Sequence, residues 1–238
     1  MSSDLILFFV AVLFAASIQT MAGFGFALTM MPLAVLLLGV RTAAPLVALV
    51  GLAVSLVNML RNRESIDLRE LRVLVLVGAV GIPFGIWALV AVNERVIRIT
   101  LGVLLIVYGL TSLLRPIKRP PIAAGWAYPF AFLAGGLAGA YNLAGPMVVL
   151  YGSLRHWSHE KFRATLQSFF TASYVLTTAL HWWGGRLTPT VLQLSAVALP
   201  AFLLGILLGS RVDRRLDRRL LRAAVNVLLA VLGVSLIL

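Results

Sequence analysis

The chain alternates long apolar runs with short clusters of charged residues. Eight runs contain no Asp, Glu, Lys or Arg, and they cover residues 5–40, 42–60, 73–93, 99–114, 120–154, 164–185, 187–210 and 223–238. The hydrocarbon core of a bilayer is about 30 Å thick and takes about 20 apolar residues as a helix. The pattern therefore predicts an all-α polytopic membrane protein.

The first run of each half is too long for one straight helix. Residues 5–40 would extend about 54 Å at 1.5 Å per residue, and they contain Gly and Pro in AGFGFALTMMPL (22–33). The second long run contains GAYNLAGPMVVL (139–150). Both runs are expected to form broken helix hairpins. Re-entrant hairpins and pairs of short full spans stay open, although 126–140 and 143–154 are short for complete spans.

The run lengths repeat along the chain. They are 36, 19, 21 and 16 residues, followed by 35, 22, 24 and 16. NERVIRITLGVLLIVYG (93–109) also aligns with DRRLLRAAVNVLLAVLG (217–233). Internal duplication is typical of secondary transporters. We predict repeat 1 at 1–114 (hairpin 5–40, spans 42–60, 73–93 and 96–114), a cytoplasmic linker at 115–123, and repeat 2 at 124–238 (hairpin 124–154, spans 163–183, 190–210 and 220–238).

The basic residues favour one topology. If each hairpin returns to the side it came from, 16 Lys and Arg residues lie on one side and four on the other; if each crosses once, the split is 12 to 8. Because cytoplasmic loops collect Lys and Arg, the first topology is preferred. Each repeat then has three spans, an odd number, so the second repeat is inverted relative to the first. Both termini are predicted to lie outside.

Composition and charge exclude several classes of protein. The chain is 61% hydrophobic and 12% charged, with a mean hydropathy of +1.01, which leaves too few polar residues for a soluble surface. The net charge of +12 is attributed to cytoplasmic loops rather than to binding of nucleic acid. The predicted spans contain no carboxylate, which argues against a cation carrier. No catalytic set, metal site or cofactor site is expected, so we expect no enzyme.

The breaks are the candidate binding site. Gly23, Gly25 and Gly145 permit unusual backbone torsions, and Pro32 and Pro146 each lack an N–H group. A helix that restarts inside the membrane exposes free N–H groups and the positive end of its dipole, which favours an anion. Tight packing or a kink is the structural alternative.

Polar residues near the breaks extend the candidate site. Asn142 is expected to be the N-cap of the helix that restarts, or to donate from its side chain to a ligand. Further candidates flank the first break or lie on the span after the second: Gln19, Thr29, Gln167 and Thr171. Hydrogen bonding between helices is their alternative role. Arg41 and Lys161 follow the two hairpins at matching positions, where they would attract anions or serve as ordinary loop charges.

Four motifs carry a family resemblance. They are GFGFALTMMPL (23–33), GAYNLAGPMVVL (139–150), GAVGIPFG (78–85) and LPAFLLGILLGSRV (199–212). With them, essentially the whole chain resembles the sulfite exporter TauE/SafE family. The resemblance implies an anion permease of inverted repeats that handles sulfite, sulfonates and related organosulfur anions.

We therefore expect a multi-pass permease in the bilayer of a bacterial inner membrane. It would export a small anion, sulfite or a related organosulfur oxyanion, by alternating access, with the substrate held at the helix breaks. A homodimer is compatible with this interpretation. The alternative is a membrane scaffold or enzyme subunit without transport activity of its own.

Overall fold

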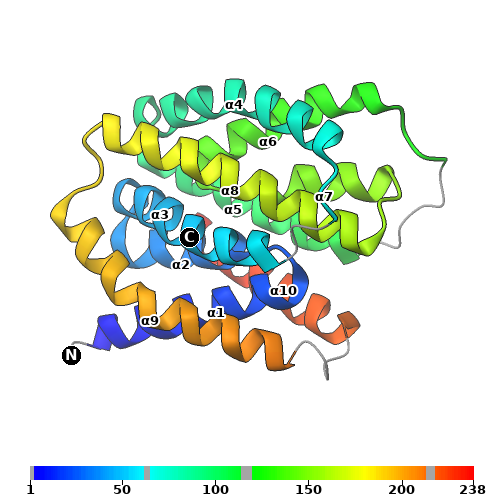
Figure 1. Ribbon diagram of the computed structural model, residues 1–238. Helices are drawn as coiled ribbons and strands as arrows, with labels where there is room; N and C mark the ends of the chain where they lie inside the picture. Colours follow the sequence, from blue (N-terminus) through cyan, green and yellow to red (C-terminus); the bar gives the residue numbers. More distant parts are fainter. Residues whose placement is uncertain (1–2, 62–64, 114–119, 213–217) are drawn as a thin grey trace.

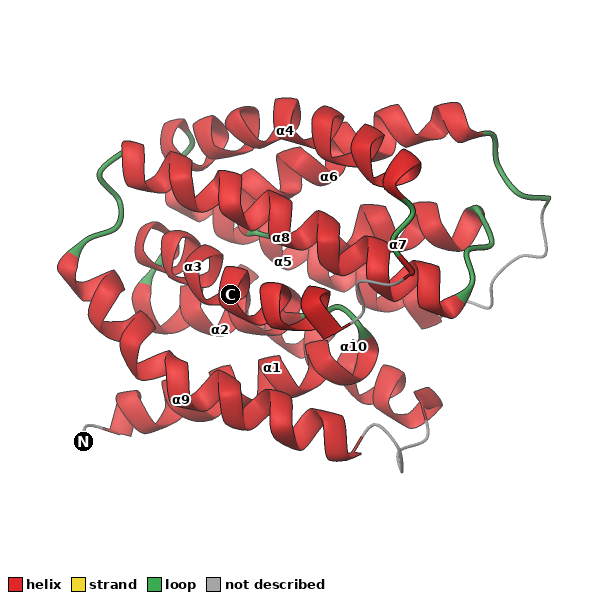
Figure 2. Ribbon diagram, viewed as in Figure 1, coloured by secondary structure: helices red, strands yellow, loops and turns green. Residues whose placement is uncertain are grey.

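The computed structural model describes residues 3–61, 65–113, 120–212 and 218–238, and this part of the chain is helical and contains no strand (Figures 1 and 2). The predicted linker 115–123 lies largely outside the described residues, which resume at Pro120. A 3-10 turn at Ala124–Trp126 precedes the sixth helix. The α-helices are α1 (Ser3–Ala22), α2 (Phe26–Leu38), α3 (Val40–Arg61), α4 (Leu68–Ala91), α5 (Glu94–Leu113), α6 (Ala127–Tyr141), α7 (Gly145–Leu154), α8 (His159–Trp183), α9 (Pro189–Val212) and α10 (Arg218–Ile237).

Helices from the two halves of the chain pack in pairs. Helix α4 lies along α6 at the top of Figure 1, and α1 lies along α9 at the bottom. Helix α3 packs against α8 between these pairs, and α5 packs against α10. The first helix of each half therefore lies against the fourth helix of the other half.

Glycines bring the paired backbones into direct contact. A Cβ atom added to Gly81 or Gly85 of α4 would collide with backbone atoms of α6. Gly205 and Gly209 of α9 meet the backbone of α1 in the same way, at Leu13 and Ser17. In each pair the glycines are four residues apart, so they lie on one face of their helix. Small residues at such positions are the usual means of close helix packing in membranes.

The outward faces of the helices are apolar. Leu76, Val80, Phe84 and Trp87 of α4 are each more than half exposed, although they are large hydrophobic residues. In water such a stripe would be unfavourable, whereas lipid is a suitable solvent for it. Among the described residues, α3, α4 and α9 are long and apolar enough to cross a membrane. These features are those of a multi-pass membrane protein.

Both long first runs are interrupted, the first at the glycines of residues 23–25 and the second after Asn142, whereas Pro32 lies inside α2 and does not mark the break. Helix α1 ends at Ala22 and α2 begins at Phe26, while α6 ends at Tyr141 and α7 begins at Gly145. Helices α6 and α7 have 15 and 10 residues, which correspond to about 23 and 15 Å. Neither length covers a bilayer core of about 30 Å, and this favours a re-entrant hairpin in the second half.

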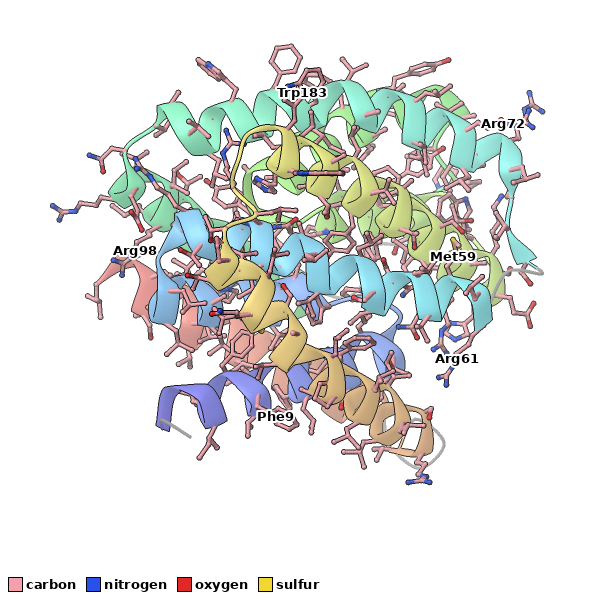
Figure 3. All side chains as sticks on the ribbon, turned by 60° about the vertical axis from the view of Figure 1, so that its left-hand side comes forward. Phe9, Met59, Arg61, Arg72, Arg98 and Trp183 are labelled. Carbon is pink, nitrogen blue, oxygen red and sulfur yellow. The ribbon has the colours of Figure 1, made fainter. Side chains whose placement is uncertain are left out.

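Basic residues lie at both ends of the helix bundle. Arg61 and Arg72 lie toward one end of the molecule in Figure 3, and Arg98 lies toward the other. Helix α4 separates Arg72 from Arg98 in either of the two topologies weighed from the sequence, so this arrangement is common to both.

Close packing of α4 on α6 predicts a strong contrast between two neighbouring glycines. A Cβ atom at Gly135 would collide with the backbone of Gly78, whereas a Cβ atom at Gly136 would meet nothing within 4 Å. Gly135→Ala should therefore lower the free energy of unfolding by about 1–3 kcal/mol, because it overpacks the interface. Gly136→Ala should be neutral or stabilising, since Ala favours the helix.

Thermal unfolding in detergent, followed by circular dichroism, measures both variants. Equal melting temperatures for Gly135→Ala and Gly136→Ala would contradict the close approach of α4 and α6.

Candidate functional site

The first break is a short segment with left-handed backbone torsions. Gly23 has φ +81° and Gly25 has φ +112°. Side chains rarely tolerate such torsions, so glycine is needed at both positions. Helix α2 restarts directly after Gly25, and its first intrahelical bond runs from the N–H of Thr29 to the carbonyl of Gly25 at 3.0 Å.

Two buried glutamines hold this break in place. The N–H of Phe26 donates to Gln19 Oε1 at 3.0 Å, and Gln19 Nε2 donates to Gln167 Oε1 at 3.3 Å. Gln167 Nε2 in turn donates to the carbonyl of Gly23 at 2.6 Å. Because Gln167 lies on α8, this chain of amides joins the break in the first half to a helix of the second half.

The second break is closed by Asn142. This residue follows α6 with φ 58°, a left-handed conformation that Asn adopts more readily than most residues. The N–H groups of Asn142 and Leu143 donate to Ala138 and Leu137, at 2.8 and 3.1 Å, and so cap the end of α6. Asn142 Nδ2 donates to the carbonyl of Ala44 in α3 at 2.9 Å. This break is therefore also tied to the opposite half.

The two breaks face one small, partly open cavity. It lies between the first turns of α2 and α7, and the Tyr174 ring, which packs on Gly51 of α3, closes part of its wall. The lining residues are Gln19, Gly25, Ala27, Leu28, Asn142, Leu143, Gly145, Phe170 and Tyr174. The cavity thus brings together residues from both predicted hairpins and from α8.

The cavity is electropositive without a basic side chain. Ala27 and Leu28 lie in the first turn of α2, where N–H groups have no preceding helical carbonyl to bond, and Gly145 occupies the same place in α7. Each helix N-terminus carries about half an elementary positive charge. Among the described residues that line the cavity, none is Lys, Arg, His, Asp or Glu. Such a site can bind a small anion through backbone N–H groups.

The structure separates the predicted site residues into three sets. Gln19, Gly25, Asn142 and Gly145 line the cavity. Close to it, Gly23 and Gln167 form the amide chain. The others do not line it: Thr29 and Pro32 are buried inside α2, Pro146 lies in the first turn of α7, and Thr171 Oγ1 donates to the carbonyl of Gln167 within α8.

The cavity and its surroundings include residues that were not among the predicted site residues, and three of them are informative. Phe170 lines the cavity, and its spacing three residues after Gln167 on one helical face was a usable signal. Ala44 supplies a backbone carbonyl, which leaves no signal in a sequence. Arg163, counted only as a loop charge, donates to the carbonyl of Thr20 at 2.7 Å and packs its stem on Gly23.

The two basic residues after the hairpins have different surroundings. Arg41 lies exposed in the first turn of α3. Lys161 Nζ pairs with Asp67 Oδ2 at 2.6 Å and lies 5.4 Å from the centre of the Trp157 ring. Nearby, Glu70 accepts from Arg155 at 3.0 Å and from the Tyr151 hydroxyl at 2.7 Å. This cluster ties the start of α4 to α7 and α8.

Comparison with known proteins gives one clear result. The family described as Sulfite exporter TauE/SafE matches residues 8–236, nearly the whole chain. No curated protein and no solved structure gives a significant match.

The amide chain across the first break predicts that Gln167 is needed for stability. Gln167→Leu removes the donor to the Gly23 carbonyl and the acceptor for Gln19, which leaves buried polar groups unpaired. We expect a loss of about 1–3 kcal/mol in the free energy of unfolding, measured by thermal unfolding in detergent. Gln193→Leu, on the exposed face of α9, is the matched control. Equal effects of the two changes would contradict the role of the amide chain.

The Lys161–Asp67 pair predicts a dependence of stability on acid pH. The hydrogen bond from Lys161 lowers the pKa of the Asp67 carboxyl below its ordinary 3.8. A lowered pKa in the folded state means that the stabilisation is complete above about pH 4 and is lost as the pH falls through the folded-state value.

Asp67→Asn keeps an oxygen that can cap α4 but removes this titration. Below about pH 4 the wild type should therefore lose stability more steeply than the variant. Unfolding curves of both proteins at a series of pH values make the comparison. An equal loss of stability in the wild type and in Asp67→Asn would contradict the pairing of Lys161 with Asp67.

Proposed function

Since the chain belongs to the sulfite exporter TauE/SafE family, we propose that it is a permease that exports a small anion, sulfite or a related organosulfur oxyanion. The family is one of membrane transporters rather than enzymes, and the apolar helices are those of a multi-pass membrane protein. The substrate would be held at the helix breaks.

One observation carries this proposal. The first turns of α2 and α7, from matching positions of the two halves, line the same buried cavity. Free N–H groups at membrane depth are tolerated only where they face protein or a polar ligand. An oxyanion would satisfy several of them at once, and its charge would be balanced by the helix ends.

The pairing of helices supports movement between the halves by alternating access. Helix α1 packs on α9 and α6 packs on α4, so the hairpin of each half is held by the other half. Inverted repeats with interrupted helices at matching positions are typical of transporters that rock around a central site. In this proposal the two halves are inverted repeats that expose the cavity to each side in turn.

The proposed direction of transport follows from the negative charge of the substrate and the membrane potential. The carboxylates of the described residues lie at helix ends, at Asp4, Asp67, Glu70, Glu94 and Glu160. Within the described part of the spans, no carboxylate therefore offers coupling to a cation. In this proposal both termini lie outside a bacterial inner membrane. The membrane potential is negative inside, so it drives anions outward. It is worth about 2.3 kcal/mol per charge per 100 mV, so export needs no coupled ion.

Flux through proteoliposomes tests the site. Gly25→Leu would force a side chain onto φ +112° and against Ile18, whose Cγ2 lies 3.0 Å from the position of the added Cβ. We expect sulfite efflux to fall to the background of empty vesicles, because the first turn of α2 would be displaced. Gly185→Leu is the control: this glycine also has a positive φ, +67°, but nothing lies within 4 Å of it and it does not line the cavity.

Asn142→Ala is the second variant, and it is also expected to abolish efflux while the protein stays folded. Wild-type vesicles that release no sulfite or sulfonate above background would contradict the proposal and favour a scaffold. Full efflux by Gly25→Leu and Asn142→Ala would instead contradict the placement of the site.

A further inference from the structure

The orientation of the Asn142 amide is fixed by its partner. Asn142 Nδ2 lies 2.9 Å from the carbonyl oxygen of Ala44. A carbonyl can only accept a hydrogen bond, so the nitrogen must face it and the oxygen must face the other way. The prediction of Asn142 as an N-cap is wrong, because Asn142 follows the C-terminus of α6 and Ala144 precedes α7. The prediction that its side chain donates to a ligand meets a bonded donor that is already directed at α3.

The remaining Asn142 oxygen is an unpaired, buried acceptor on a residue that lines the cavity. Asn142 lines the cavity and is only 4% exposed. Its Oδ1 is buried and has no hydrogen-bond partner among the described residues. A buried polar atom without a partner is destabilising, so this oxygen points to a ligand that brings an O–H or N–H donor.

Two sources of positive charge lie beside the cavity. The two helix N-termini supply about half an elementary charge each, and Arg163, whose stem packs on Gly23, brings its charge to the first break. No described lining residue is basic. The cavity therefore combines donors for an anion with one acceptor for a proton on the ligand.

We infer, on the basis of the proposed function, that the transported species is a monoanion with one O–H group, such as hydrogen sulfite, and not the sulfite dianion. Its O–H donates to Asn142 Oδ1, and its other oxygens accept from the N–H groups of α2 and α7. No proton passes to the protein, so each transport event moves one negative charge and carries one bound proton outward.

Groups on the protein that could add their own pH dependence lie around the cavity. Tyr174 on α8 lines it, and Tyr141 precedes Asn142 on α6. Arg163 and His181 lie on α8, and Arg41 lies three residues before Ala44 on α3. The α1 and α2 residues that line the cavity are uncharged. A probe that keeps one charge at every pH is therefore needed as a reference.

Binding of three anions to the purified protein in detergent makes the test, with calorimetry or ligand-induced thermal stabilisation as the readout. The probes are sulfite, sulfate as a dianion without a proton, and methanesulfonate as a monoanion without an O–H group. Methanesulfonate keeps its charge across the pH range, so its profile reports only titration of the protein.

The expected result is a loss of sulfite affinity, relative to methanesulfonate, of about tenfold per pH unit above the pH at which hydrogen sulfite loses its proton. At lower pH methanesulfonate should bind about tenfold more weakly than sulfite or worse, since it leaves Asn142 Oδ1 unpaired. Sulfate should not compete. Asn142→Gly, which suits the positive φ, should bind both monoanions equally.

Three results would overturn the inference. One is sulfite affinity that rises with pH or does not change, and another is sulfate that binds as tightly as sulfite. The third is methanesulfonate that matches sulfite in the wild type, which would mean that water already satisfies Asn142. In each case anion binding itself would remain, so the proposed function would stand. Absence of binding by every anion at every pH would overturn the proposed function as well.

Discussion

Every feature of the site follows from the need to bond backbone groups that lie at membrane depth. Breaking a helix there leaves N–H and carbonyl groups that lipid cannot satisfy. At the first break, Gln19 and Gln167 bond Phe26 and Gly23; at the second, Asn142 turns the chain and bonds α3. These side chains satisfy only part of what the breaks expose. The first turns of α2 and α7 line the cavity, and the free N–H groups of a helix N-terminus are suited to an anion.

The close packing of the helix pairs places the two breaks opposite one another. Glycines on α4 and α9 let the backbones of α6 and α1 approach closely, which fixes the depth of each hairpin against the other half. The hydrogen bonds that the side-chain amides of Gln167 and Asn142 make between the halves also hold the two breaks in place, over a shorter distance. Any movement that opens the cavity to one side must therefore change the contacts of Gln167 with Gly23 or of Asn142 with Ala44, and these bonds are weak enough to exchange with a ligand or water.

The helical class and the approximate positions of both breaks could be predicted, because apolar run length, Gly and Asn act locally. Helix boundaries were less predictable: α4 begins at Leu68, before its apolar run, since Asp67 caps it. Gln19 and Gln167 were found as candidates, but their mutual bond joins residues far apart in sequence, and no local pattern indicates it. The Asn142 amide was expected to face a ligand with its nitrogen. The nitrogen instead donates to the carbonyl of Ala44, and the position of a backbone carbonyl cannot be read from a sequence.

A structure of the protein with selenite, a heavier analogue of sulfite, tests the central claim most directly, because the anomalous scattering of selenium locates the anion without assumptions about its contacts. The account predicts one selenium position between the first turns of α2 and α7, within hydrogen-bond distance of backbone N–H groups of Ala27, Leu28 or Gly145. Selenium bound only at Arg41 or at the Lys161 cluster, with the cavity empty, would contradict it.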